Sequence, residues 1–104
     1  MIHPPISHPG WPPLVLLTRS GCCLCAGLAE RLGSLLPQGT LQLVDVDGDP
    51  VLQQRFGLLV PLLVVGSDPL RDPVLPRVPP RPKGLALQRW LEKHLHRLAT
   101  ADHG

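Results

Sequence analysis

Residues 14–25 read LVLLTRSGCCLC, and this stretch decides the fold of the chain. Its first four residues are apolar without interruption, as in a strand that is buried on both faces. A turn with a glycine follows, and from Cys23 to Leu36 leucines recur at spacings of three and four residues, as on one face of a helix. Because all three cysteines lie at the start of this helix, as Cys22, Cys23 and Cys25, the stretch also indicates where the chemistry is.

The composition predicts a single packed domain. Of the 104 residues, 43% are hydrophobic and 17% are charged, which favours a globular fold over disorder. The net charge of +2 is too small to indicate a nucleic-acid partner, and the 3% aromatic residues provide no platform for stacking bases. No run approaches the roughly 18 apolar residues of a membrane span. We therefore expect a cytoplasmic monomer that binds neither nucleic acid nor membranes.

The remaining chain alternates strands and helices. The apolar runs and turn residues predict, in order, a strand at 40–46, a short helix from Pro50 to Gly57, a strand at 61–65, a short edge strand near 70–75, and a helix at 85–98. The six prolines in residues 69–82 restrict the fourth strand to an edge. Since a strand–helix–strand crossover is right-handed, the first two strands should be parallel.

These elements give the order β-α-β-α-β-β-α. We expect an α/β fold with a four-stranded mixed sheet and three helices. The domain should span residues 14–98, between a flexible Pro-rich arm at 1–13 and a tail at 99–104. Residues 1–13 contain five prolines and no basic segment that would mark a secretory signal.

The cysteine spacing points to thiol–disulfide exchange. Cys22 should lie just before the first helical turn and Cys25 inside it, where unpaired N–H groups and the helix dipole stabilise a thiolate. Arg19, three residues upstream, adds a positive charge. Both effects should lower the pKa of the Cys22 thiol from its ordinary value of about 8.5. The thiolate is the attacking species in exchange, so Cys22 is the expected nucleophile.

Two other functions remain open. A Cys-x-x-Cys pair is half of a tetrahedral zinc site, and three thiolates could bind copper(I) or an iron–sulfur cluster. The sequence has no second cysteine pair to complete such a site. Alternatively, the domain could be a non-catalytic adaptor that binds partners through the edge at Val60-Pro61.

The sequence resembles the glutaredoxin-like branch of the thioredoxin superfamily. Residues 18–25 are similar to the Arg-Ser-Gly-Cys-Pro-Tyr-Cys segment of many glutaredoxins, and Val60-Pro61 matches the family's cis-proline dipeptide. Residues 45–57 resemble small bacterial glutaredoxin-like proteins with a Cys-x-Leu-Cys site. The resemblance covers roughly residues 14–98 and implies a minimal thioredoxin fold.

The resemblance also implies roles for individual residues. Cys22 would be the nucleophile and Cys25 the resolving thiol. Pro61 would be cis, which would place the backbone of Val60 beside the sulfurs, where it could pair with a substrate main chain as an added strand. The substrates would be disulfide-containing proteins or glutathione, with a thiol system as reductant and no bound cofactor.

Several residues bear on the choice of substrate. Arg19 and Arg55 could meet a carboxylate, such as that of glutathione. Cys23 replaces the usual proline and offers an auxiliary thiol. Residues 79–84 (Pro-Pro-Arg-Pro-Lys-Gly) stand where glutathione-binding glutaredoxins carry a Gly-Gly pair and an Asp, and here Arg81 and Lys83 would supply positive charge instead.

Overall fold

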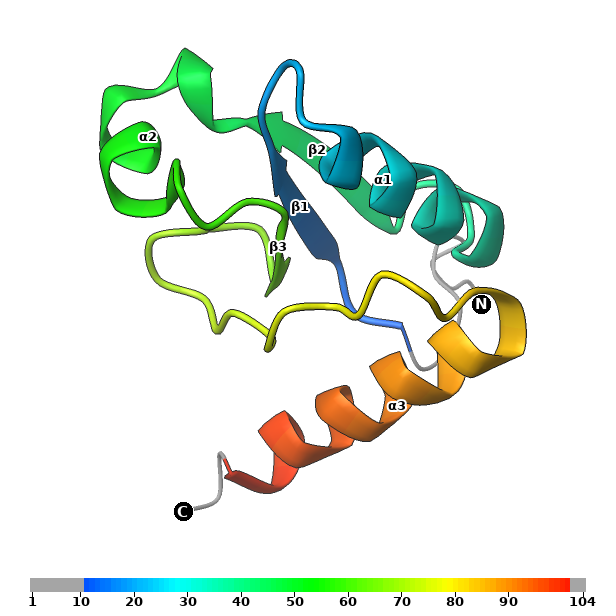
Figure 1. Cartoon of the computed structure of the whole chain (residues 1–104). Helices are drawn as coiled ribbons and strands as arrows, with labels where there is room; N and C mark the ends of the chain where they lie inside the picture. The colour runs from blue at the N-terminus through cyan, green and yellow to red at the C-terminus, as the bar shows by residue number, and fades with distance from the viewer. Residues whose placement is uncertain (1–10, 102–104) are drawn as a thin grey trace.

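The computed structural model describes residues 11–101. It is a small α/β domain in which the central strand of a sheet is followed by a helix that begins at the cysteines (Figure 1). Its elements are β1 (Leu14–Thr18), α1 (Cys23–Leu35), β2 (Leu41–Asp45), the 3-10 turn η1 (Val46–Gly48), α2 (Pro50–Phe56), β3 (Leu62–Val65) and α3 (Gly84–Ala101).

The sheet has the strand order β2-β1-β3. β1 and β2 are parallel, with Leu14 opposite Leu41, as the crossover through α1 predicts. β1 and β3 are antiparallel, with Leu17 opposite Leu62. The central position of β1 explains its uninterrupted apolar sequence, because both of its faces are covered.

Alternate residues of β1 point into two separate cores. Leu14 and Leu16 pack with leucines of α1 and α3, whereas Val15 and Leu17 pack with residues of η1 and α2 on the other face. Figure 1 shows α2 on the opposite side of the sheet from α1 and α3. The leucine spacing of the last predicted helix is confirmed, since Leu87 and Leu91 are buried in the first core.

The predicted fourth strand near 70–75 is wrong, and the sheet has three strands in the described residues. This segment makes only a single antiparallel bridge, between Val64 and Val74. Pro73 and Pro76 stand close to the bridge on both sides, and a proline has no N–H to extend a ladder of hydrogen bonds. The chain therefore leaves the sheet and runs to α3 as a connector, residues 76–83.

The helix boundaries follow from local chemistry. The Asp49 side chain accepts the N–H of Val51 at 2.9 Å and caps α2, with Pro50 at the first position, as predicted. α3 begins at Gly84, whose φ is +56°, and continues to Ala101, three residues beyond the predicted end.

The predicted N-terminal arm lies outside the described residues except for 11–13. Of these, Trp11 packs against the core between the sheet and α1 and α3. Within residues 11–101, no helix is long and apolar enough to cross a membrane.

Candidate redox site

Cys22 and Cys25 are joined by a disulfide at the start of α1, with their Cα atoms 5.2 Å apart. Cys22 is the N-cap residue in extended backbone conformation, and Cys25 lies three residues later, within the first turn. The backbone N–H of Cys25 donates to Cys22 Sγ at 3.1 Å. The first N–H groups of a helix have no acceptor within the helix. The Cys22 sulfur accepts one of them, the N–H of Cys25.

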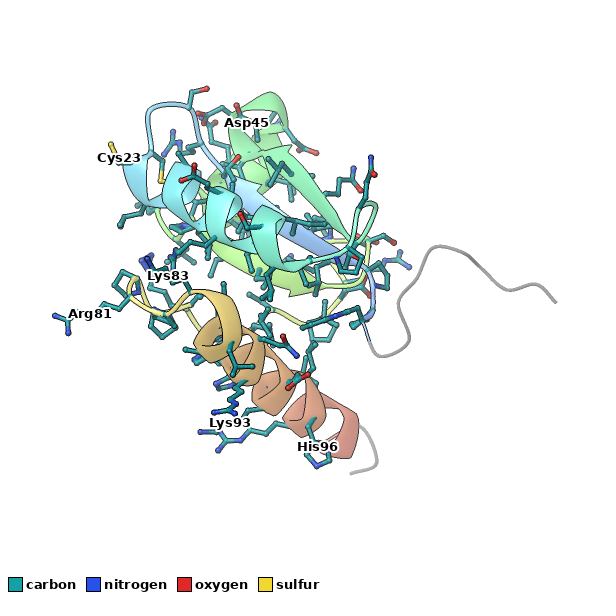
Figure 2. All side chains as sticks on the ribbon, turned by 90° about the vertical axis from the view of Figure 1, so that its right-hand side faces the viewer. Cys23, Asp45, Arg81, Lys83, Lys93 and His96 are labelled. Carbon is teal, nitrogen blue, oxygen red and sulfur yellow. A yellow bond between two sulfur atoms is a disulfide. The ribbon has the colours of Figure 1, made fainter. Side chains whose placement is uncertain are left out.

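The two bonded cysteines differ in accessibility. Cys25 is 2% exposed, whereas Cys22 is only half-buried. Cys23 is free and exposed, and it lies at the surface on the left of Figure 2. Leu24, between the two bonded cysteines, is 60% exposed. A molecule that approaches the disulfide from outside therefore meets Cys22 before Cys25.

The helix start favours a negative charge on Cys22 in the reduced protein. The first turn of α1 contains no acidic residue that would oppose a thiolate. The N–H of Cys25 already points at Cys22 Sγ, and the positive end of the helix dipole acts at the same place. Both effects stabilise a thiolate at an N-cap.

Arg19 is held by two residues that are distant from it in the sequence, Asp47 and Gly57. Its guanidinium forms an ion pair with Asp47 at 3.0 Å and donates through NH1 to the carbonyl of Gly57 at 3.0 Å. The hydrogen bond from Arg19 keeps the pKa of Asp47 below its ordinary value. The positive charge of Arg19 is therefore partly balanced by a carboxylate.

A signal for this contact is present in the sequence. Asp47 follows the second strand and Arg19 follows the first, and the ends of neighbouring parallel strands meet at one edge of a sheet. The same edge brings Ser20 close to Asp45, with 3.4 Å between Ser20 Oγ and the carboxylate.

The peptide bond between Val60 and Pro61 is cis, as the resemblance implied. It directly precedes β3, whose first residue pairs with Leu17 near the end of β1, so it lies at the end of the sheet where the chain turns into Cys22. Within residues 11–101, the backbone N–H and C=O of Val60 have no hydrogen-bond partner. They are available to a main chain that binds from outside.

Arg55, the other arginine that the resemblance assigns to substrate binding, belongs to α2. It is exposed in the last turn of α2, and its guanidinium carbon is 5.7 Å from the centroid of the Phe56 ring. Phe56 packs in the same core as Val60. The structure thus brings Cys22, Cys25, Val60 and Pro61 to one end of the sheet.

A hollow of about 130 Å³ opens beside Pro61, between α1 and the connector. It is lined by Leu24, Leu28, Arg31, Pro61, Arg77, Val78 and Pro80. Of these residues, only Pro61 is assigned to the site by a motif in the sequence. The sequence predicts the connector as a break in the sheet that carries the charges of Arg81 and Lys83, and its buried residue, Val78, gives no periodic signal.

In the part of the chain that the structure describes, no three His, Cys, Asp or Glu side chains are grouped so that they could hold a metal ion. Cys22 and Cys25 are bonded to each other, and Cys23 faces outward in Figure 2. The described residues therefore hold a disulfide-bonded Cys-x-x-Cys pair and no group of three side chains suited to a metal ion.

Comparison with known proteins agrees with this geometry. The chain is similar to a solved structure, the X-ray structure of Northeast Structural Genomics target protein XcR50 from X. campestris, with 31% identity and a TM-score of 0.51. The similarity covers 77% of this chain and 96% of the other. No curated protein matches the chain. Residues 13–92 match the family described as "Glutaredoxin-like domain (DUF836)", and the chain therefore belongs to this family of glutaredoxin-like domains.

Proposed function

We propose that the protein is a thiol–disulfide oxidoreductase that works by dithiol exchange through Cys22 and Cys25. One observation carries the proposal: an accessible sulfur at a helix N-cap is bonded to a buried sulfur one turn later, beside a cis-proline. This arrangement provides an activated nucleophile and a resolving thiol that is shielded from other partners.

The exchange proceeds in two steps from the reduced protein. The Cys22 thiolate attacks one sulfur of a substrate disulfide, forms a mixed disulfide and releases the other substrate sulfur as a thiolate, which takes up a proton. Cys25 then loses its proton and attacks Cys22 Sγ. The Cys22–Cys25 disulfide forms, and the substrate leaves as a second thiol. Two electrons pass from the protein to the substrate, and a thiol reductant returns them.

The backbone of Val60 would position the substrate for the first step. Its free N–H and C=O can pair with two groups of an extended substrate chain, as in the addition of a strand to a sheet edge. Pro61 fixes the direction of this backbone. We propose disulfide-containing proteins or glutathione as the substrate class and the cytoplasm as the compartment, with Arg19 modulating the Cys22 thiolate and Arg55 available to substrate carboxylates.

Single cysteine variants test this function. The reduced protein and its variants are mixed with a peptide disulfide, and the release of peptide thiol is followed over time. Cys22→Ser should lose all exchange. Cys25→Ser should accumulate a mixed disulfide on Cys22, which peptide mass spectrometry locates. Cys23→Ser is the matched control, since it removes an exposed neighbouring thiol and should exchange at nearly the normal rate.

The same assay can refute the proposal. If Cys22→Ser retained full activity, Cys22 would not be the nucleophile. If the wild-type protein exchanged with no disulfide although its thiols were free, the interpretation as a non-catalytic adaptor would replace the oxidoreductase.

A further inference from the structure

The hollow between α1 and the connector is a groove with an apolar wall and a basic rim. Five of its seven lining residues are apolar, and the other two are Arg31, from α1, and Arg77, from the connector. No acidic residue lines it. The groove therefore combines two kinds of surface that favour different parts of one ligand.

The groove is lined by neighbours of the bonded cysteines and of Val60 in the chain. Leu24, on its wall, stands between the two bonded cysteines in the sequence, and Pro61 directly follows the unpaired backbone of Val60. A substrate strand held on Val60 with its cysteine at Cys22 would have its neighbouring residues only 3.8 Å further along the chain, from Cα to Cα. Side chains flanking the reacting cysteine are thus within reach of the groove.

The positive charges at the rim are not neutralised. Arg77 donates to the carbonyl of Leu59 at 3.1 Å, and Arg31 donates to the carbonyls of Pro79 and Pro82. Carbonyl groups fix the position of a guanidinium without cancelling its charge.

Two more cations follow on the connector, Arg81 and Lys83, and both are exposed. In Figure 2 they lie on the same side of the molecule as Cys23. Among the residues that the structure describes, no carboxylate forms an ion pair with Arg31, Arg77, Arg81 or Lys83. The rim is therefore complementary to an acidic partner.

Exposed apolar side chains occur on the groove wall and in the residues that lead to Val60. Leu24 is 60% exposed, and Leu58 and Leu59, just before Val60, are 92% and 50% exposed. Glutathione has no apolar side chain that would cover these leucines or fill the hollow. A polypeptide with an apolar residue beside its cysteine would do both.

We propose that this groove binds an extended segment of a protein substrate, in which an apolar residue adjoins the reacting cysteine and an acidic residue follows next to it. The inference rests on the proposed oxidoreductase function and specifies its substrate class. The apolar side chain occupies the hollow beside Leu28 and Val78, and the carboxylate meets Arg77 at the rim. The chemistry is the two-step exchange described above.

The test uses three symmetric peptides, so that the direction of binding does not matter. Their sequences are Glu-Leu-Cys-Leu-Glu, Lys-Leu-Cys-Leu-Lys and Glu-Ala-Cys-Ala-Glu, each linked through its cysteine to the same chromogenic aromatic thiol. The reduced protein releases the aromatic thiol, and the absorbance gives kcat/KM. We expect the first peptide to react about tenfold faster than the second and several-fold faster than the third.

Two variants assign the preference to the groove. Arg77→Glu should reduce or reverse the preference for the acidic over the basic peptide, and Leu24→Ser should reduce the preference for leucine over alanine. Arg89→Glu is the matched control, because Arg89 is an exposed arginine of α3 that does not line the groove. It should leave the ratios of kcat/KM unchanged, and circular dichroism verifies that each variant is folded.

The outcomes separate this inference from the proposed function. Equal rates for all three peptides, an unchanged charge preference in Arg77→Glu, or a glutathione mixed disulfide that reacts faster than every peptide would overturn the inference and leave the oxidoreductase standing. No release from any disulfide would overturn both.

Discussion

At the residue scale, the site depends on the difference between two cysteines that are three positions apart. Cys22 is accessible at the N-cap, and Cys25 is buried in the first turn. The positive charge of Arg19 is partly balanced by the carboxylate of Asp47, and the same guanidinium donates to the carbonyl of Gly57. Arg19 therefore also connects the turn before the cysteines to the end of α2.

Asp47→Asn should make Cys22 more acidic. The substitution removes the counter-charge of Arg19 and leaves its positive charge unbalanced near the start of α1. Because the pair is solvent-exposed, we expect only a small shift of the Cys22 alkylation profile toward lower pH. The measurement is the pH dependence of alkylation of Cys22 in the reduced protein, read by peptide mass spectrometry.

Asp68→Asn is the matched control for this prediction. Asp68 also forms an ion pair with an arginine, Arg71, at 3.8 Å. This pair lies in the loop after β3, at the end of the strand opposite to Val60. The alkylation profile of Cys22 should not change in this variant. A rise in the pKa of Cys22 in Asp47→Asn would show that the carboxylate supports the thiolate through the position of Arg19.

At the element scale, the stretch from β1 to α1 could be predicted from the sequence because every signal agrees there. The apolar run, the glycine turn and the leucine spacing each require the element that is found. The connector could not be predicted in the same way. Its prolines exclude a regular strand, but only the folded chain shows that Val78 is buried and that Arg77 turns back to Leu59.

Two glycine substitutions should affect stability in opposite directions. A Cβ at Gly57, the C-cap of α2, would lie 2.5 Å from the carbonyl oxygen of Gln53, so Gly57→Ala should destabilise the fold by about 1–3 kcal/mol. A Cβ at Gly33, inside α1, would meet nothing within 4 Å, and Gly33→Ala should stabilise by about 0.5–1 kcal/mol. Urea denaturation of both variants measures the two changes. Equal effects would mean that the backbone near Gly57 relaxes freely.

In α3, the titratable side chain of His94 lies next to Trp90, whose fluorescence can report the protonation of the imidazole. The rings of Trp90 and His94 have centroids 4.2 Å apart, and burial, together with the charges of Arg97 and Lys93, lowers the pKa of His94. Trp90 fluorescence should therefore change at a pH below the ordinary midpoint of about 6.5. His94→Gln should abolish this transition. A midpoint above 6.5 would contradict the assigned environment.

The lowered pKa of His94 determines how the contribution of this residue to stability changes with pH. The unfolded chain binds a proton at His94 more readily than the folded chain does. The contribution of His94 to stability is thus present above the unfolded pKa and is lost as the pH falls through the folded pKa. Urea midpoints at pH 7 and pH 5 should differ less in His94→Gln than in the wild type.

At the scale of the whole molecule, one strand connects two cores. Leu14 and Leu16 belong to the core with α1 and α3, and Val15 and Leu17 belong to the core with α2. Cys22 and Cys25 lie at the start of α1, whereas the segment leading to Val60 follows α2, which packs on the other face of the sheet. The site at the end of the sheet is thus assembled from both halves of the fold and depends on β1 to hold them together.

This arrangement predicts that the two cores unfold together. Leu52→Ala, in the core on the α2 side, should cost about 2–5 kcal/mol. The partly buried tryptophans, Trp11 and Trp90, pack only against the other core. Because β1 is common to both, the urea midpoint from tryptophan fluorescence should nevertheless fall as far as the midpoint from circular dichroism. Leu58→Ala, at a highly exposed leucine, should leave both midpoints nearly unchanged. If fluorescence kept its wild-type midpoint in Leu52→Ala while the dichroism shifted, the two faces of the sheet would be independent, and α2 could open without disturbing α1 and its cysteines.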